Sequence, residues 1–214
     1  MPYRPTERTR AKAQQRRETI LRAAAELVAE RGWAGVTVAA VADRAGVSNG
    51  NVYTHFPDKA ALLSETFRRL ADREHRAVAE ATRAAGDQAG VHPAASAVAV
   101  VVEVFTRRAL AARRLAWALL VEPSDPAVEE GRLVFRRHYQ ELLEGGIAEG
   151  VASGELPPQH SAMTAAALIG AISEALVGPL SPTTDASDPD EVVRELTATC
   201  LRTAGIPTHQ EHPR

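Results

Sequence analysis

The most constraining feature of this 214-residue chain is the spacing of three small or branched residues within residues 36–63. Ala42, Gly46 and Val52 stand four and then six positions apart. A small residue lets two helix backbones approach, a glycine can take positive φ in the turn between them, and a branched residue closes the core beneath. The spacing therefore predicts two short helices that cross at a tight turn, which is a helix-turn-helix.

Three polar residues mark where helices of this region should begin. The side chains of Thr37, Ser48 and Asp58 can each accept a hydrogen bond from the otherwise unpaired amides of a first helical turn. An earlier helix is predicted from Gln14, because apolar residues recur there at steps of three and four until Gly32 stops the pattern. We therefore expect a three-helix module over residues 13–58.

The remainder of the chain is also predicted to be helical. Valine, leucine and alanine dominate, aromatic residues make up only 4%, and no long stretch alternates apolar and polar residues as strands do. A connecting helix is expected over residues 59–85 and a helical body over residues 86–206, with a short tail over 207–214. The expected fold is all-α, with about nine helices.

Charge and cysteine content narrow the possible classes of protein. The net charge is −2, yet the first 17 residues hold six basic side chains and one acidic one, and residues 1–12 are predicted to form a mobile basic arm. The single Cys200 excludes an internal disulfide framework and favours a reducing cytoplasm. No apolar export signal follows the basic residues. Residues 163–180 approach the length of a membrane span, but Glu174 within them favours a buried helix.

Residues 48–63 follow the pattern SxGxVYxHFxxKxxLL. With this motif the chain resembles the TetR family of bacterial transcriptional regulators over roughly its first third. The resemblance implies a helix-turn-helix DNA-binding domain followed by a helical ligand-binding and dimerisation domain. Trp33 and the pair Gly35 and Val36 depart from the family's usual residues before the second helix, so a weaker phosphate contact is expected at Val36.

A recognition helix presents its first residues to base edges in the major groove, while its flanks hold phosphates. Asn49 and Asn51 can pair a donor and an acceptor with adenine, and Gly50 between them allows the backbone to approach. The resemblance also assigns Asn49 and Gly50 to bases. The resemblance assigns five further positions to phosphates, namely Thr37, Tyr53, Thr54, His55 and Lys59. To these we add Ser48 and Arg44 as candidate phosphate contacts. The alternatives are that Tyr53 packs in the core and that His55 is structural. For the basic arm two interpretations stay open: it reaches the DNA backbone or an adjacent minor groove, or it is a solvated tail.

One three-helix module covers too little DNA for selective binding, so two copies are expected to read two half-sites. The resemblance implies that the last two helices of each subunit form the interface between the copies. The residues assigned to this interface are Ala165, Gly170, Ile172, Leu176, Val193 and Leu196. Helical periodicity does not separate a dimer interface from the core of one subunit.

The resemblance further implies a ligand cavity among the middle helices. Its candidate residues combine apolar bulk with a few polar groups: Phe105, Trp117, Phe135, His138, Tyr139 and Glu174. His138 and Tyr139 are adjacent, so they cannot both face the cavity. Glu174 is costly to bury unless it is paired, and exposure is its alternative.

The predicted function is a homodimeric repressor that a small, largely apolar ligand releases from a palindromic DNA operator. Control by a protein partner and activation in place of repression are the alternatives. A helical enzyme is a remote one, because the chain has no nucleophile elbow, glycine-rich phosphate loop, HExxH or CxxC motif. Neither a cofactor nor a metal site is predicted.

Overall fold

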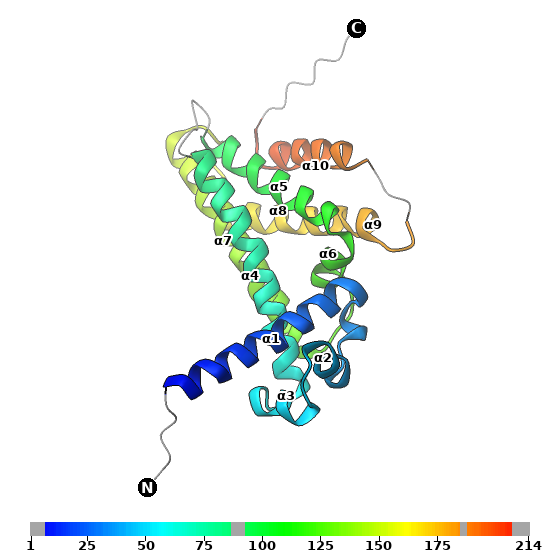
Figure 1. The fold of residues 1–214 in the computed structure, drawn as a ribbon. Coiled ribbons are helices and arrows are strands. Elements are labelled where there is room, and N and C mark those ends of the chain that lie inside the picture. Colours follow the sequence, from blue (N-terminus) through cyan, green and yellow to red (C-terminus); the bar gives the residue numbers. More distant parts are fainter. Residues whose placement is uncertain (1–6, 87–92, 185–187, 207–214) are drawn as a thin grey trace.

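The computed structural model describes residues 7–86, 93–184 and 188–206 of the chain. Throughout these residues the regular structure is helical, with ten α-helices, one 3₁₀ turn and no strand (Figure 1). The all-α fold predicted from the sequence is confirmed. The helix beyond the nine expected is α9 (Val177–Leu180), a single turn that follows α8 (Ser161–Ala175).

The amino-terminal module consists of three helices and a short turn. Thr37 Oγ1 accepts the amide hydrogen of Ala40 over 3.1 Å and Ser48 Oγ accepts that of Asn51 over 3.2 Å, so both residues are the predicted caps. Gly46 has a φ of 65°, the left-handed conformation that glycine adopts without strain. The elements are α1 (Glu7–Arg31), the 3₁₀ turn (Trp33–Gly35), α2 (Val38–Ala45) and α3 (Asn49–His55).

Helix α1 begins at Glu7, well before the predicted start at Gln14. Residues 7–12 of the predicted arm are therefore part of α1, while residues 1–6 lie outside the described residues. The physical reason is local: residues 7–12 hold no proline or glycine, most of them favour helix, and an acidic Glu7 in the first turn suits the helix dipole. The exposed basic side chains of this segment thus project from a helix.

The long helix α4 (Lys59–Gly86) joins the module to the body (Figure 1). Asp58 Oδ1 caps it by accepting the amide hydrogen of Ala61 over 2.7 Å, as predicted. The apolar stripe of α4 packs against α5 and α7. The remaining elements of the body are α5 (Pro93–Ala111), α6 (Arg113–Leu120), α7 (Pro126–Ser153) and α10 (Pro189–Thr203).

One hydrophobic core runs from the module into the body. Its link is Phe67 on α4, whose ring centroid lies 6.2 Å from that of Trp33 and 6.1 Å from that of Phe135 on α7. All three rings are buried. Because close-packed interiors transmit displacements, a rearrangement around Phe135 can reach the helix-turn-helix through this chain of rings.

Candidate nucleic-acid interface and effector pocket

The start of α3 is open to solvent. Ser48, Asn49 and Gly50 are all exposed, and the Ser48 cap leaves the Asn49 side chain with no hydrogen-bond partner within the described residues. A Cβ added at Gly50 would meet nothing closer than Ser48 Oγ at 3.9 Å, and Gly50 does not have positive φ. The fold of the subunit therefore does not require a glycine at this position.

Asn51 differs from Asn49 in its burial. Its residue is half-buried, and its side-chain oxygen is buried without a hydrogen-bond partner among the described residues. The paired contact to adenine predicted for Asn51 needs that oxygen at the surface. In this conformation the prediction is wrong for Asn51, because the helix turns its side chain toward the module interior.

The side chains predicted to hold phosphates surround α3. Thr37, Tyr53, Thr54 and Lys59 are exposed, with Tyr53 at 52% of its surface, so the alternative that Tyr53 packs in the core is wrong. The Thr54 hydroxyl donates to the carbonyl oxygen of Gly50 over 3.0 Å. The capping hydroxyls of Thr37 and Ser48 accept amide hydrogens, which leaves their own hydrogens free to be donated outward.

His55 lies at the end of α3 close to two arginines of α1. Burial lowers the pKa of His55, and the positive charges of Arg17 and Arg16 lower this pKa further. Arg17 also stacks over the Phe56 ring, 4.9 Å from its centroid, and lies 3.5 Å from Glu65. Arg16 is exposed and forms no ion pair with another residue of the described part of the chain. Sequence reasoning did not single out Arg16, because its proximity to α3 depends on how α1 crosses the module.

Arg44 is exposed but already forms ion pairs with two glutamates of α1. Its guanidinium lies 2.7 Å from Glu30 and 3.3 Å from Glu26, and these carboxylates raise its pKa. The phosphate contact predicted for Arg44 would have to compete with both carboxylates of α1.

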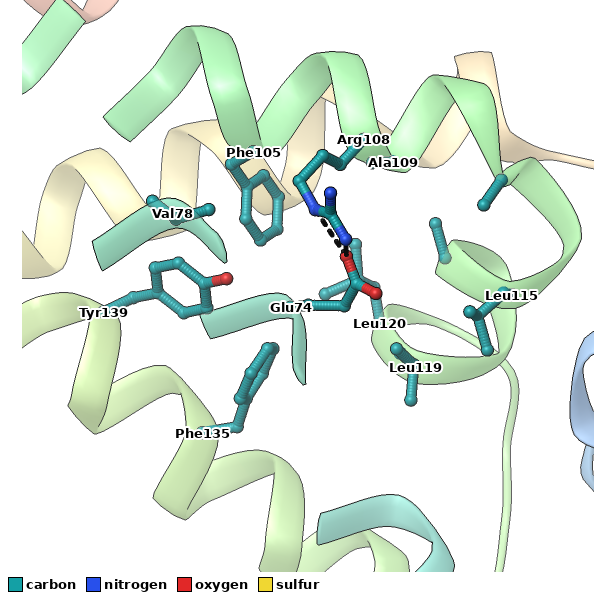
Figure 2. Close-up of a pocket in the computed structure, with 12 residues that line it drawn as sticks. Glu74, Val78, Phe105, Arg108, Ala109, Leu115, Leu119, Leu120, Phe135 and Tyr139 are labelled. Atoms are coloured by element: carbon teal, nitrogen blue, oxygen red, sulfur yellow. Dashed lines mark hydrogen bonds and ion pairs between the residues drawn. The ribbon is translucent and has the colours of Figure 1, made fainter. Parts of the chain in front are cut away.

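A narrow pocket lies within the body, between α4, α5, α6 and α7 (Figure 2). Its cavity volume is about 40 Å³, and three of the six predicted ligand residues line it: Phe105, Phe135 and Tyr139. Phe135 and Tyr139 are buried, and the Tyr139 hydroxyl has no hydrogen-bond partner among the described residues. Burial, followed by the negative charge of Glu74, raises the pKa of Tyr139.

The charged members of the pocket were not predicted from the sequence. Glu74 on α4 and Arg108 on α5 form an ion pair at the pocket edge, with Oε2 of Glu74 2.7 Å from the guanidinium (Figure 2). The other Glu74 oxygen lies 3.0 Å from Arg73. Because Glu74 and Arg108 are 34 positions apart, no local pattern indicated that they meet.

The other three predicted ligand residues do not line this pocket. Trp117 is half-buried on α6. His138 lies beside α4, with its ring centroid 5.5 Å from that of His75. Tyr139 contacts the same His75 ring at 5.1 Å, but of the two residues only Tyr139 lines this pocket. Glu174 is exposed, which is the alternative stated for it. A carboxylate on a surface position needs no partner, so Glu174 gives no sign of a ligand.

The residues predicted for the dimer interface are mostly core residues of one subunit. Ala165, Ile172 and Leu176 are buried where α8 packs against α7, and Val193 and Leu196 are buried on α10, which packs against α5 and α8. Their assignment to a surface between copies is wrong, because the apolar stripe of each helix faces its own subunit. Gly170 alone is exposed. It belongs to an exposed stripe with Met163, Ala166 and Ala167.

Within the described residues no helix is long and apolar enough to cross a membrane, and no cluster of three or more histidine, cysteine or acidic side chains could hold a metal ion.

Comparison with known proteins gives a consistent family. The profile of bacterial regulatory proteins of the tetR family matches residues 20–66. The HTH-type transcriptional regulator TtgR of Pseudomonas putida is 27% identical over 79% of this chain and 82% of its own length. The HTH-type transcriptional regulator BetI of Stenotrophomonas maltophilia is 40% identical over 34% of this chain and 37% of its own length.

Solved structures show the same fold over most of the chain. The transcriptional regulator FadR from Bacillus subtilis in complex with stearoyl-CoA aligns with a TM-score of 0.72 at 21% identity, covering 89% of this chain and 99% of FadR. RolR in complex with resorcinol aligns with a TM-score of 0.67 at 21% identity, covering 92% of this chain and 90% of RolR. The proteins that match are transcriptional regulators, not enzymes. Residues 20–66 of this chain therefore match the amino-terminal domain of the TetR family of bacterial transcriptional regulators, and the similar proteins together support a DNA-binding regulator of this family.

Proposed function

We propose that this DNA-binding regulator is a cytoplasmic homodimeric repressor, which leaves a palindromic operator when a small, largely apolar ligand occupies the pocket of the body. The observation that carries the DNA-binding half is the open start of α3, where Asn49 and Gly50 are exposed and unengaged. The observation that carries the ligand half is the pocket between α4, α5, α6 and α7.

Asn49 and Gly50 are the proposed base-reading positions. The Asn49 amide offers the donor and acceptor that match N7 and N6 of adenine. Gly50 is supported by its surroundings, since neither backbone conformation nor crowding within the subunit calls for a glycine there. A side chain at this position would hold the helix away from the floor of the groove.

The phosphate contacts are proposed for the side chains around these two positions. The exposed hydroxyls of Thr37, Tyr53 and Thr54 and the exposed ammonium of Lys59 are suited to phosphate oxygens. Arg16 extends this surface on the α1 side, beside His55. Backbone phosphates fix the orientation of the helix, so this group sets affinity while Asn49 sets sequence preference.

Dimerisation is proposed through the exposed stripe of α8. Met163 is 68% exposed, and Ala166, Ala167 and Gly170 recur with it at helical spacing. Such small residues allow two helices to approach closely, and exposed apolar stripes are the surfaces that proteins bury against partners. Of the six interface residues predicted from the sequence, the proposed interface therefore retains Gly170. It adds Met163, Ala166 and Ala167, which lie on the same face of α8.

Control by a small molecule is supported over control by a protein partner by the pocket and by the neighbours. FadR and RolR each hold a small molecule in the solved structure, and KstR2 of Rhodococcus jostii, 42% identical over 57 residues, is a repressor by name. A ligand lowers the affinity for DNA only if it binds the DNA-incompetent conformation more tightly. Helix α4 borders the pocket and begins directly after α3, so it is the element that carries the change from the pocket to the recognition helix.

The test of the proposal is selection of bound duplexes from a random DNA pool by the purified full chain at near-physiological salt. The expected result is an inverted repeat whose half-sites contain adenine at the position read by Asn49. Recovery of a single half-site would contradict the dimer, and no enrichment by a folded dimer would contradict sequence-specific binding.

A further inference from the structure

We propose that the effector is an uncharged aromatic molecule with a single oxygen substituent, held by the Tyr139 hydroxyl between the rings of Phe105 and Phe135. This inference rests on the proposed function and names the ligand class of the same pocket.

The Tyr139 hydroxyl supplies the first step. The residue is only 3% exposed, and its hydroxyl lacks a hydrogen-bond partner among the described residues. Buried hydroxyls in folded proteins are nearly always paired, because an unpaired one has lost water without compensation. Figure 2 shows that this hydroxyl points into the pocket, toward the space bordered by Phe105, Phe135 and Glu74. A ligand oxygen in the pocket would accept its hydrogen.

The rings around the hydroxyl supply the second step. Phe105 and Phe135 both stand edge to face against Tyr139, with centroids 5.1 and 4.9 Å away and interplanar angles of 84° and 87°. Three rings in this arrangement expose both faces and edges to the pocket, and a fourth aromatic ring can add offset or edge contacts to them. The opposite wall is aliphatic, with Leu115 and Leu119 of α6 facing the rings (Figure 2).

The ion pair at the pocket edge supplies the third step. Both oxygens of Glu74 are engaged, one by Arg108 and one by Arg73, so the charges of the pocket already balance. A carboxylate or ammonium on the ligand would have to break this pair or remain buried without a counter-ion, and either is costly. The unpaired Tyr139 hydroxyl and the Glu74–Arg108 pair, whose charges already compensate each other, therefore favour a neutral ligand with one polar atom.

The pocket has to widen before it can hold a ligand. A cavity of about 40 Å³ holds a few waters at most, so the walls have to move apart even for a small aromatic molecule. Ala109, Ala112 and Ala116 line the pocket at the end of α5 and the start of α6, and their short side chains take up little space there.

The test compares three probes that share one ring system: 2-naphthol, 2-methylnaphthalene and 2-naphthoate. Each is titrated calorimetrically into the full chain without DNA, so that the result is independent of operator binding. We expect 2-naphthol to bind about tenfold more tightly than 2-methylnaphthalene, because only the hydroxyl pairs with Tyr139. We expect 2-naphthoate to bind more weakly than 2-naphthol, since its charge has no free partner. Equal binding of naphthol and methylnaphthalene, stronger binding of naphthoate, or no binding by any probe would overturn the proposal.

Two variants locate the site. Tyr139→Phe keeps the ring and should reduce 2-naphthol affinity to that of 2-methylnaphthalene, whose own affinity should not fall. Thr203→Val is the matched control: it removes an exposed hydroxyl from α10, which does not line the pocket, and should leave both affinities unchanged. Ala116→Leu fills the pocket and should weaken both probes. Unchanged 2-naphthol binding by Tyr139→Phe would overturn the proposal, whereas failure of the DNA selection with intact probe binding would count against the proposed function alone.

Discussion

The indole Nε1 of Trp33 donates a buried hydrogen bond of 2.7 Å to the carbonyl oxygen of Ala118. Trp33 belongs to the DNA-binding module, and Ala118 lies on α6, whose Leu115 and Leu119 line the effector pocket. The same carbonyl also accepts a hydrogen bond of 2.7 Å from Arg132 of α7. The pocket wall is thus tied directly to the module as well as through α4.

Replacing Trp33 by phenylalanine tests how much this bond contributes. The variant keeps an aromatic ring beside Phe67 but removes the donor, and Arg132 still occupies the Ala118 carbonyl. We expect the free energy of unfolding to fall by about 1 kcal/mol, measured by urea denaturation. Trp117→Phe is the matched control, because Trp117 is a half-buried ring on α6, next to Ala118. It should lower the free energy of unfolding by less than Trp33→Phe does. Equal losses in the two variants would mean that ring size, not the hydrogen bond, sets the effect.

Two substitutions on the DNA-binding surface should act differently. Asn49→Ala is expected to relax the base preference at one position of each half-site, with a loss of about 1–3 kcal/mol on the preferred base. Lys59→Ala should weaken all sequences alike and make the slope of log affinity against log salt shallower by about one per subunit. Binding to a set of single-base operator variants at several salt concentrations separates the two effects. If Lys59→Ala changed the base preference, its assignment to a phosphate would be incorrect.

His55 should make DNA binding depend on pH. Its pKa in the free protein is lowered by burial and by Arg17 and Arg16, whereas a nearby phosphate would favour the protonated ring and raise this pKa. Binding then takes up a proton, so the affinity for DNA should rise as pH falls from about 8 to 6. His55→Gln keeps a hydrogen-bond donor but does not titrate in this range. We expect it to flatten the dependence measured by fluorescence anisotropy; the same slope in both proteins would refute the phosphate contact of His55.

What the sequence predicts well in this protein is local. The caps at Thr37, Ser48 and Asp58 and the left-handed Gly46 follow from hydrogen bonds and backbone preferences within a few residues, and all four are found in the structure. The exposed position of Asn49 follows from its place directly after a cap.

What the sequence leaves open depends on contacts between distant elements. The same apolar periodicity on α8 fits a stripe facing α7 or a second subunit, and the structure places Ala165 and Ile172 on the inner side. The Glu74–Arg108 pair depends on the packing of α4 against α5, which no spacing along the chain specifies. The buried oxygen of Asn51 depends on the rotation of α3 about its own axis, and its proximity to Asn49 in the sequence gave no sign of it.

Gly170 offers a test of the dimer that leaves the subunit intact. A Cβ built at Gly170 meets nothing within 4 Å, and the residue is exposed on α8, so Gly170→Glu should not disturb the fold of one subunit. In a dimer that packs α8 against its copy, the substitution would bring two carboxylates into a close apolar contact, which is strongly unfavourable. We expect the variant to sediment as a folded monomer and to lose most of its affinity for the full operator.

The matched control is Gly145→Glu on α7. Gly145 is also exposed and also has open space at its Cβ, so this variant adds the same charge to a helix of the same subunit. It should remain a dimer, with unchanged operator affinity. Because glutamate favours helix more than glycine does, both variants should unfold at the same or a slightly higher temperature. A dimeric Gly170→Glu protein would show that the two subunits meet elsewhere than on the exposed stripe of α8.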